Sequence, residues 1–161
     1  MKVNIALLTV TDTRTFDNDK SGAILVDKIK ESNHNLLDRK LCKDNKDEIV
    51  LILKEWLKNE KIDAIITTGG TGLTGRDITP EALDEIADKH IPGFGEVFRN
   101  ISIKTVGTSA IQSRACAVLS NGKYIFALPG SSGGVTDAWD EILKHQLLSL
   151  IHISEPTRQD R

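Results

Sequence analysis

Hydrophobic and polar residues alternate along the chain with two different periods. Residues 3–10 are almost continuously apolar, which is typical of a strand buried on both faces of a parallel sheet. Apolar residues then recur at helical spacing over residues 22–29, and residues 36–42 form a second, more polar run. The pattern therefore predicts a central strand, a helix, and a strand nearer the edge of the sheet.

The clearest helical pattern lies at residues 49–57. Its apolar stripe comprises Ile49, Ile52, Leu53, Trp56 and Leu57. A short β-branched strand follows at residues 64–68 and stops at Gly69-Gly70. The next helix is expected to begin at Thr79-Pro80-Glu81, with the threonine as the capping residue.

The second half of the chain continues the same alternation. Apolar residues at helical spacing predict a helix from Pro92-Gly93 to about residue 104. Residues 105–120 are ambiguous. They fit a helical turn followed by a strand, and the boundaries of both stay open. Residues 124–128 form a strand that ends at Pro129-Gly130, and residues 135–147 carry the stripe of a last helix.

Strands that alternate with helices, without long linkers or internal repeats, predict one Rossmann-like α/β domain over residues 1–148. Its expected form is a three-layer α/β/α sandwich around a mainly parallel sheet. Ligands of such folds bind beyond the carboxyl ends of the strands. Three polar or glycine-rich turns fall at those ends, at residues 11–14, 68–77 and 129–134. We therefore expect the chemistry in these turns.

Residues 149–161, SLIHISEPTRQDR, depart from the pattern of the last helix. The segment mixes two isoleucines with a proline and charges, and it resembles the translated read-through of a sequencing adapter. It is therefore expected to be a non-native tail that adds little to folding. The alternative is a native terminus that frays.

Composition narrows the class of protein. The 161 residues, 39% of them hydrophobic, suffice for one domain with a substantial core, and no apolar run approaches the roughly 18 residues of a membrane-spanning helix. Two cysteines without a C-x-x-C spacing support neither disulfides nor a zinc site, which fits a cytoplasmic location. Because the net charge is only −2, no attraction to nucleic acid or membranes is expected.

The sequence TTGGTGLTGRDITPEA follows the third predicted strand and is rich in glycine. Glycines permit positive φ angles, so the backbone amides of Gly69, Gly70, Thr71 and Gly72 are able to converge on a phosphate or carboxylate. The N-terminus of the following helix also favours an anion. The chain has no Walker motif, and no G-x-G-x-x-G sequence follows the first predicted strand, where a dinucleotide-binding fold carries it. A tight turn without a ligand is the alternative.

Asp77 lies between this loop and the helix, where a carboxylate repels bound phosphate unless a cation intervenes. Mg²⁺ held by one or two carboxylates and by phosphate oxygens resolves the conflict, so Asp77 is a candidate metal ligand. Asp44, just after residues 36–42, is a second candidate. The alternatives are an aspartate that caps a turn at position 77 and a solvated surface residue at position 44.

Two further segments place polar side chains near these turns. Ser113 precedes Arg114, whose guanidinium is suited equally to holding a phosphate and to pairing with a structural carboxylate. Ser131 follows Pro129-Gly130 and adds a hydroxyl. No catalytic triad is predicted from these serines, because the four histidines lie on predicted helices, in turns or in the expected tail.

Four sequences occur in order along the chain: TGGTGLTGRDITPEA, IPGFGEVFR, QSRA and LPGSSGG. Together they resemble the MoaB/Mog family of molybdenum cofactor biosynthesis proteins, over about residues 2–148. The LPGSS and GFGEVFR sequences are more similar to the bacterial MoaB branch than to the Mog branch, which typically has a second proline after LPG.

The resemblance implies a domain that binds molybdopterin, a pterin that carries a dithiolene and a phosphate monoester. In catalytically competent members of that family, this phosphate attacks the α-phosphorus of Mg²⁺-ATP, which yields adenylylated molybdopterin and pyrophosphate. The two important carboxylates of the family correspond to Asp44 and Asp77, with Asp77 holding Mg²⁺ and Asp44 orienting the metal or the nucleotide. The loop at residues 69–72 would cradle phosphate. The pterin or nucleotide site would be lined by Ser113, Arg114, Pro129, Gly130 and Ser131.

The resemblance also implies a homotrimer or homohexamer. Two alternatives to a molybdopterin adenylyltransferase stay open: a noncatalytic molybdopterin-binding carrier, and an oligomeric scaffold of the same pathway. The presence of both aspartates favours the enzyme.

Overall fold

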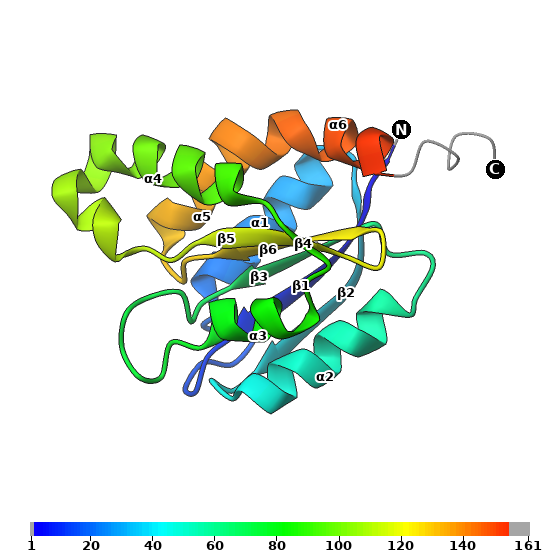
Figure 1. Cartoon of the computed structure of the whole chain (residues 1–161), viewed down its shortest axis with the longest axis horizontal. Helices are drawn as coiled ribbons and strands as arrows, with labels where there is room; N and C mark the ends of the chain where they lie inside the picture. The colour runs from blue at the N-terminus through cyan, green and yellow to red at the C-terminus, as the bar shows by residue number, and fades with distance from the viewer. Residues whose placement is uncertain (1, 155–161) are drawn as a thin grey trace.

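A computed structural model describes residues 2–154 of the chain (Figure 1). Six strands form one sheet in the order β2-β1-β3-β6-β5-β4. The strands are β1 (Asn4–Val10), β2 (Asn35–Cys42), β3 (Ala64–Thr68), β4 (Lys89–His90), β5 (Cys116–Ser120) and β6 (Lys123–Leu128). The first four strands of that order run parallel, and β5 is antiparallel to both of its neighbours. The predicted, mainly parallel sheet is therefore confirmed.

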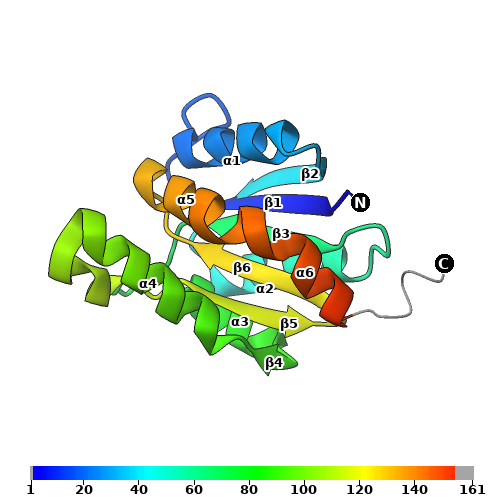
Figure 2. The ribbon, with the colours of Figure 1, turned by 90° about the horizontal axis from the view of Figure 1, so that it is seen from above.

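Helices cover both faces of the sheet (Figures 1 and 2). The helical segments are α1 (Lys20–Glu31), α2 (Lys46–Leu57), α3 (Thr79–Ile86), α4 (Pro92–Val106), η1 (Gly107–Gln112), α5 (Ser132–Ala138), η2 (Trp139–Leu143) and α6 (Lys144–Ser154). One face carries α1, α4, α5 and α6, and the other carries α2 and α3. This arrangement confirms the expected three-layer α/β/α sandwich. No helix within the described residues is long and apolar enough to cross a bilayer.

Side chains that alternate along the central strands create two hydrophobic cores. Ile5 and Leu7 of β1 pack towards α1 and α5, whereas Leu8 packs towards Ile49 and Leu53 of α2. All five side chains are fully buried. Because both faces are covered, β1 is apolar at most of its positions, with Asn4 and Thr9 as the exceptions.

The order in which strands are added to the sheet reverses at β1. The chain moves from β1 to β2 on one side and later returns to β3 on the other side, so the carboxyl ends of β1 and β3 form a topological switch point. Two hydrogen bonds join the loops that follow β3 and β6. The Gly69 amide donates to the Leu128 carbonyl at 3.0 Å, and the Thr68 hydroxyl donates to the Pro129 carbonyl at 2.7 Å. Two of the predicted functional turns therefore meet at this edge of the sheet, beside the end of β1.

The structure resolves the segment whose boundaries the sequence leaves open. Residues 105–120 contain the end of α4, the 3-10 helix η1 and strand β5. The sequence also gives no indication of β4, because two residues are too short to show a period of two.

The last helix extends beyond its predicted end at residue 147. It includes the π-helical turn η2 and continues as α6 to Ser154. Leu143, Leu147 and Ile151 lie four residues apart on the buried face, and Ile151 is only 3% exposed. The predicted break at residue 149 is therefore wrong for residues 149–154. The rest of the expected tail, residues 155–161, lies outside the described residues.

Candidate functional site

The glycine-rich loop between β3 and α3 lies at the carboxyl edge of the sheet (Figure 1). Gly69 and Gly70 have φ angles of 103° and 73°, and a Cβ atom at Gly69 would lie 2.3 Å from the Val10 carbonyl oxygen. Only glycine tolerates this combination of positive φ and close approach. The Gly69 amide is already bonded to β6, but the amides of Gly70 and Thr71 have no hydrogen-bond partner among residues 2–154. An anion at this loop would therefore be bound by the second and third amides rather than by the first.

Thr79 holds the loop from the other side. Its hydroxyl donates to the Gly69 carbonyl at 2.9 Å, and its amide donates to the Gly70 carbonyl at 3.1 Å. The predicted role of Thr79 as a helix cap is therefore wrong, because α3 begins at Thr79 itself and Ile78 is the capping residue, without a side-chain bond. The buried hydroxyl stabilises the loop instead of the helix end.

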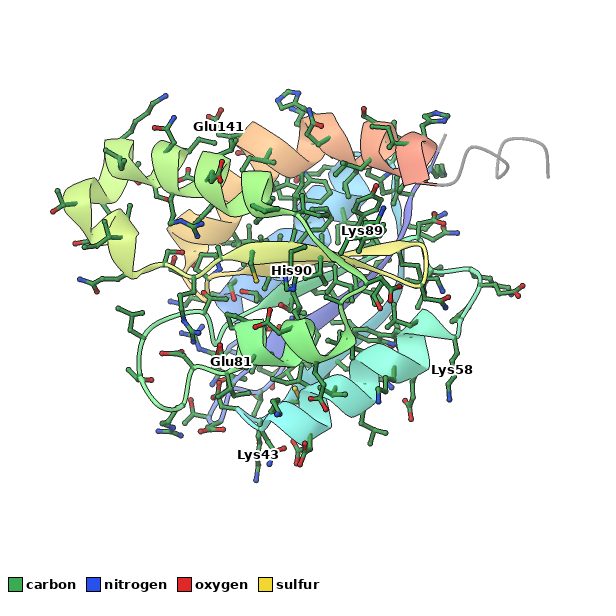
Figure 3. The ribbon with its side chains drawn as sticks, viewed as in Figure 1. Lys43, Lys58, Glu81, Lys89, His90 and Glu141 are labelled. Atoms are coloured by element: carbon green, nitrogen blue, oxygen red, sulfur yellow. The ribbon has the colours of Figure 1, made fainter. Side chains whose placement is uncertain are left out.

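Arg114 clamps the loop to α3. Its guanidinium donates to both carboxylate oxygens of Glu81, at 2.5 and 3.1 Å, and to the carbonyls of Gly72 and Asp77, each at 2.7 Å. Figure 3 shows Glu81 on α3, next to this loop. The bond to Glu81 is the main reason that the pKa of Arg114 is raised. Four of the five N–H groups of Arg114 are used, so the structure favours the structural ion pair over a direct phosphate contact.

Asp77 closes a turn within the loop. Its Oδ2 atom accepts hydrogen bonds from the Thr74 amide at 3.0 Å and from the Thr74 hydroxyl at 2.8 Å. Burial acts to raise the pKa of this carboxyl, but the bonds from Thr74 and Gly72 and the positive charge of Arg114 outweigh it and hold the pKa below its ordinary value. Asp77 is therefore ionised at neutral pH, and both bonds from Thr74 go to Oδ2 rather than to Oδ1.

Asp44 faces the same loop from the end of β2. If Gly70 carried a Cβ atom, that atom would lie 3.5 Å from Oδ1 of Asp44. A Cβ atom on Gly72 would lie 2.7 Å from Oδ2 of Asp77. The pKa of Asp44 is raised, first by burial and then by the negative charge of Asp77. The structure thus brings the two predicted carboxylates together across the loop. The described residues contain no cluster of three or more potential metal ligands, so the pair fits Mg²⁺ only when phosphate oxygens and water complete the coordination.

A second ion pair connects the loop to the end of β1. Arg76 contacts the Asp12 carboxylate, whose other oxygen accepts a hydrogen bond from the Asp44 amide at 2.9 Å. The loops that follow β1, β2 and β3 are therefore linked through Asp12. Sequence reasoning placed the turn at residues 11–14 at a strand end but did not single out Asp12.

A small crevice of about 120 Å³ lies at the switch point between β1 and β3. It is lined by Thr9, Val10, Thr11, Arg14, Ser21, Thr68, Gly69 and Gly130. Arg14 is the only charged residue in this lining, and its guanidinium has no hydrogen-bond or ion-pair partner within the described part of the chain. The hydroxyls of Thr9 and Thr68 donate to Asp19 and to the Pro129 carbonyl. The hydroxyls of Thr11 and Ser21, together with the unpaired guanidinium, suit a tetrahedral anion. The sequence signal for Arg14 was its position just beyond the central strand.

A larger cavity of about 390 Å³ lies between α4, η1 and α5. Three predicted residues line it, namely Ser113, Pro129 and Ser131. Ser131 also caps α5, because its hydroxyl accepts a hydrogen bond from the Gly134 amide at 3.1 Å. Gly130 lines the crevice instead, so the cavity and the crevice lie on either side of one short turn.

The chain is similar to known proteins over most of its length. The family model described as "Probable molybdopterin binding domain" matches residues 6–149. The chain is 45% identical over 153 residues to molybdenum cofactor biosynthesis protein B of Staphylococcus aureus (strain MRSA252), and the match covers 93% of this chain and 90% of that protein. It is 41% identical over 143 residues to the protein of the same name from Escherichia coli (strain K12), over 89% of this chain and 84% of that protein.

Solved structures show the same relationship. A crystal structure of molybdenum cofactor biosynthesis protein B matches with a TM-score of 0.94 and 37% identity, over 97% of this chain and 98% of that one. The tungsten cofactor synthesizing protein MoaB from Pyrococcus furiosus matches with a TM-score of 0.86 and 32% identity, over 95% and 97% of the two chains. Since the family model and these relatives cover nearly the whole domain, the chain belongs to the MoaB/Mog family of molybdopterin-binding domains.

Proposed function

We propose that this protein acts in molybdenum cofactor biosynthesis, where it binds molybdopterin and adenylylates it with Mg²⁺-ATP. The observation that carries the proposal is the pair of carboxylates, Asp44 and Asp77, which face each other across a glycine-rich loop with unpaired amides. Two carboxylates at one anion-binding loop repel each other and the phosphate, and a divalent cation removes both conflicts.

Different residues around the loop bind different parts of the substrates. Arg14 and the hydroxyls of Thr11 and Ser21 hold a phosphate group, and the amides of Gly70 and Thr71 hold a second one. The larger cavity takes the pterin, since ligand cavities of about 300 to 1,000 Å³ with mostly apolar walls suit flat ring systems. Arg114 fixes the carbonyls of Gly72 and Asp77 and so positions the loop rather than the substrate.

Mg²⁺, when bound, would neutralise the charge that develops around the α-phosphorus of the transferred adenylyl group. The Oδ1 atom of Asp77 is directed to this role because Oδ2 is held by Thr74. Asp44 completes the acidic pair and orients the metal or the nucleotide. No side chain is needed as a general base, because the attacking phosphate of molybdopterin is already ionised at neutral pH.

The names of the relatives support the pathway and the class of ligand. Molybdenum cofactor biosynthesis protein B is the name of proteins that share 41–45% identity with this chain. We extend the proposal to a cytoplasmic homotrimer or homohexamer, on the basis of the family resemblance.

The proposal is tested by incubating the protein with molybdopterin, ATP and Mg²⁺ and then measuring adenylylated molybdopterin and pyrophosphate. We expect both products in equal amounts, and neither when EDTA removes the metal. Binding of molybdopterin without either product would favour the noncatalytic carrier. Absence of binding as well would leave only the scaffold.

A further inference from the structure

Asp137 is a half-buried carboxylate on α5 that borders the larger cavity. It is the only charged residue in the lining of that cavity. Within residues 2–154 its carboxylate has neither a hydrogen bond nor a salt bridge, although Asp140, on the next turn, pairs with Lys28 at 3.0 Å. A carboxylate without a partner at the wall of a mostly apolar cavity favours a ligand that brings its own hydrogen-bond donors.

The crevice and the cavity have opposite chemical character. Arg14 lines the crevice, which therefore suits an anion, whereas Asp137 lines the cavity and repels one. Only the turn at residues 129–131 separates them, since Gly130 borders the crevice and its two neighbours in the chain border the cavity. A ligand with a phosphate at one end and a donor edge at the other matches both.

A pterin has this kind of edge. Its 2-amino group and its N3–H group lie side by side and donate in nearly parallel directions, so one carboxylate accepts from both. The pairing has the geometry of an arginine fork on a carboxylate. Phe98, Val106 and Pro129 supply apolar wall for the ring.

We infer that Asp137 is a specificity residue that accepts hydrogen bonds from the 2-amino and N3–H groups of the pterin, so that the phosphate of the same ligand is directed towards Arg14. This inference rests on the proposed function, because it assigns one end of the proposed substrate to each part of the site. Asp137 does not act on the reacting phosphate, so its effect is expected in binding and in the choice between ligands.

The test compares two simple ring systems, pterin and lumazine. Lumazine has an oxygen at the position where pterin has its 2-amino group. Calorimetry or fluorescence quenching with the full chain is expected to give at least a tenfold lower Kd for pterin than for lumazine, because the lumazine oxygen faces the carboxylate. Asp137→Asn is expected to reduce this ratio to about threefold or less. Asp140→Asn is the matched control, since it removes the same charge one turn away and outside the cavity.

Several outcomes would overturn the inference. They are equal Kd values for the two rings on the parent protein, an unchanged ratio in Asp137→Asn, or the same loss of preference in Asp140→Asn. Thermal melting of each variant verifies that the fold is intact. The assay needs neither ATP nor turnover, so a preference for pterin without adenylylation contradicts only the proposed function. Adenylylation without a preference contradicts only the role of Asp137.

Discussion

Asp77 shows how one carboxylate is able to serve both the fold and the proposed chemistry. The sequence left two interpretations of Asp77 open, a turn cap and a metal ligand. The structure assigns the turn to Oδ2, which accepts both bonds from Thr74, so Oδ1 takes no part in the contact with Thr74. The two roles are therefore compatible. For Arg114, in contrast, the bonds to Glu81 and the loop carbonyls favour only the structural role.

Asp77→Asn keeps the size of the side chain and an oxygen that accepts from Thr74, so we expect the fold to be intact. The lost charge is expected to lower the adenylylation rate on the order of 10²-fold or more through poorer metal positioning, with molybdopterin binding retained. Asp44→Asn is expected to cause a similar or smaller loss. Single-turnover rates measure both effects, and Asp47→Asn, in the exposed first turn of α2, is the control. If Asp77→Asn reacts as fast as the parent, the catalytic role of Asp77 is wrong.

Both cysteines are expected to be unreactive in the folded protein. The pKa of the Cys42 thiol is raised to about 12 and that of the Cys116 thiol to about 11, mainly because both thiols are buried. At pH 8, alkylation by iodoacetamide should therefore be about 10²- to 10³-fold slower than in the unfolded chain. The folded state keeps these protons at higher pH than the unfolded state does, so stability should fall as the pH rises from about 9 towards 12. Equal alkylation rates in folded and urea-unfolded protein would contradict the expectation.

Local sequence signals predicted elements well where one period dominates. Residues 3–10 and 49–57 appeared as β1 and α2, because continuous burial and a one-sided stripe each leave an unmistakable pattern. Capping was harder to predict, since the hydroxyl of Thr79 bonds to a carbonyl in a distant turn of the loop rather than to its own helix. The partner of Arg114 was equally hidden, because Glu81 lies 33 residues away in the chain.

The loop after β3 depends on glycine at one position more than at others. Gly69→Ala places a Cβ 2.3 Å from the Val10 carbonyl at a φ of 103°, so we expect a loss of about 2 kcal/mol or more in the free energy of unfolding. Gly75→Ala should change it by less than about 0.5 kcal/mol, because nothing lies within 4 Å of a Cβ there. Urea unfolding at constant m-value measures the difference. Equal stability of the two variants would show that the close approach at Gly69 relaxes without cost.

Helix α6 revises the expectation for the end of the chain. Deletion of residues 149–161 removes Ile151 from the core, so we expect it to lower stability by about 1.5–3 kcal/mol and the melting temperature by several degrees. Truncation after Ser154 is the matched control, since it keeps α6 and Ile151. If the longer deletion melts at the same temperature as the control, burial of Ile151 adds nothing to stability.

The whole molecule gathers its proposed binding groups at one edge of the sheet. The loops after β1, β2 and β3 meet there through Asp12, and the β6 loop meets them through the bond from Thr68 to Pro129. Strand order explains why, because parallel strands present all their carboxyl ends on one side. The sequence was sufficient to predict this edge from three turns. The separation of the crevice from the cavity depends on how α4 and η1 pack, which no local pattern encodes.

Helix α4 and the following 3-10 helix η1 carry apolar side chains that are exposed on the surface. Ile103 is 54% exposed, and Ile111 is 82% exposed. Exposed apolar residues concentrated on one segment are typical of a contact surface between subunits. These side chains give the proposed trimer or hexamer a candidate interface that the sequence did not locate.

Ile111→Asp places a charge in that candidate interface without touching either core, so the variant is expected to fold as the parent does but to dissociate. Light scattering at micromolar concentration should give three or six times the 17.7 kDa chain mass for the parent and the chain mass for the variant. Leu51→Asp is the control, because Leu51 is 61% exposed on α2, on the other face of the sheet. A parent of 17.7 kDa would contradict the proposed oligomer altogether. A trimer or hexamer that survives Ile111→Asp would place the interface elsewhere, and dissociation of Leu51→Asp alone would assign it to the α2 face.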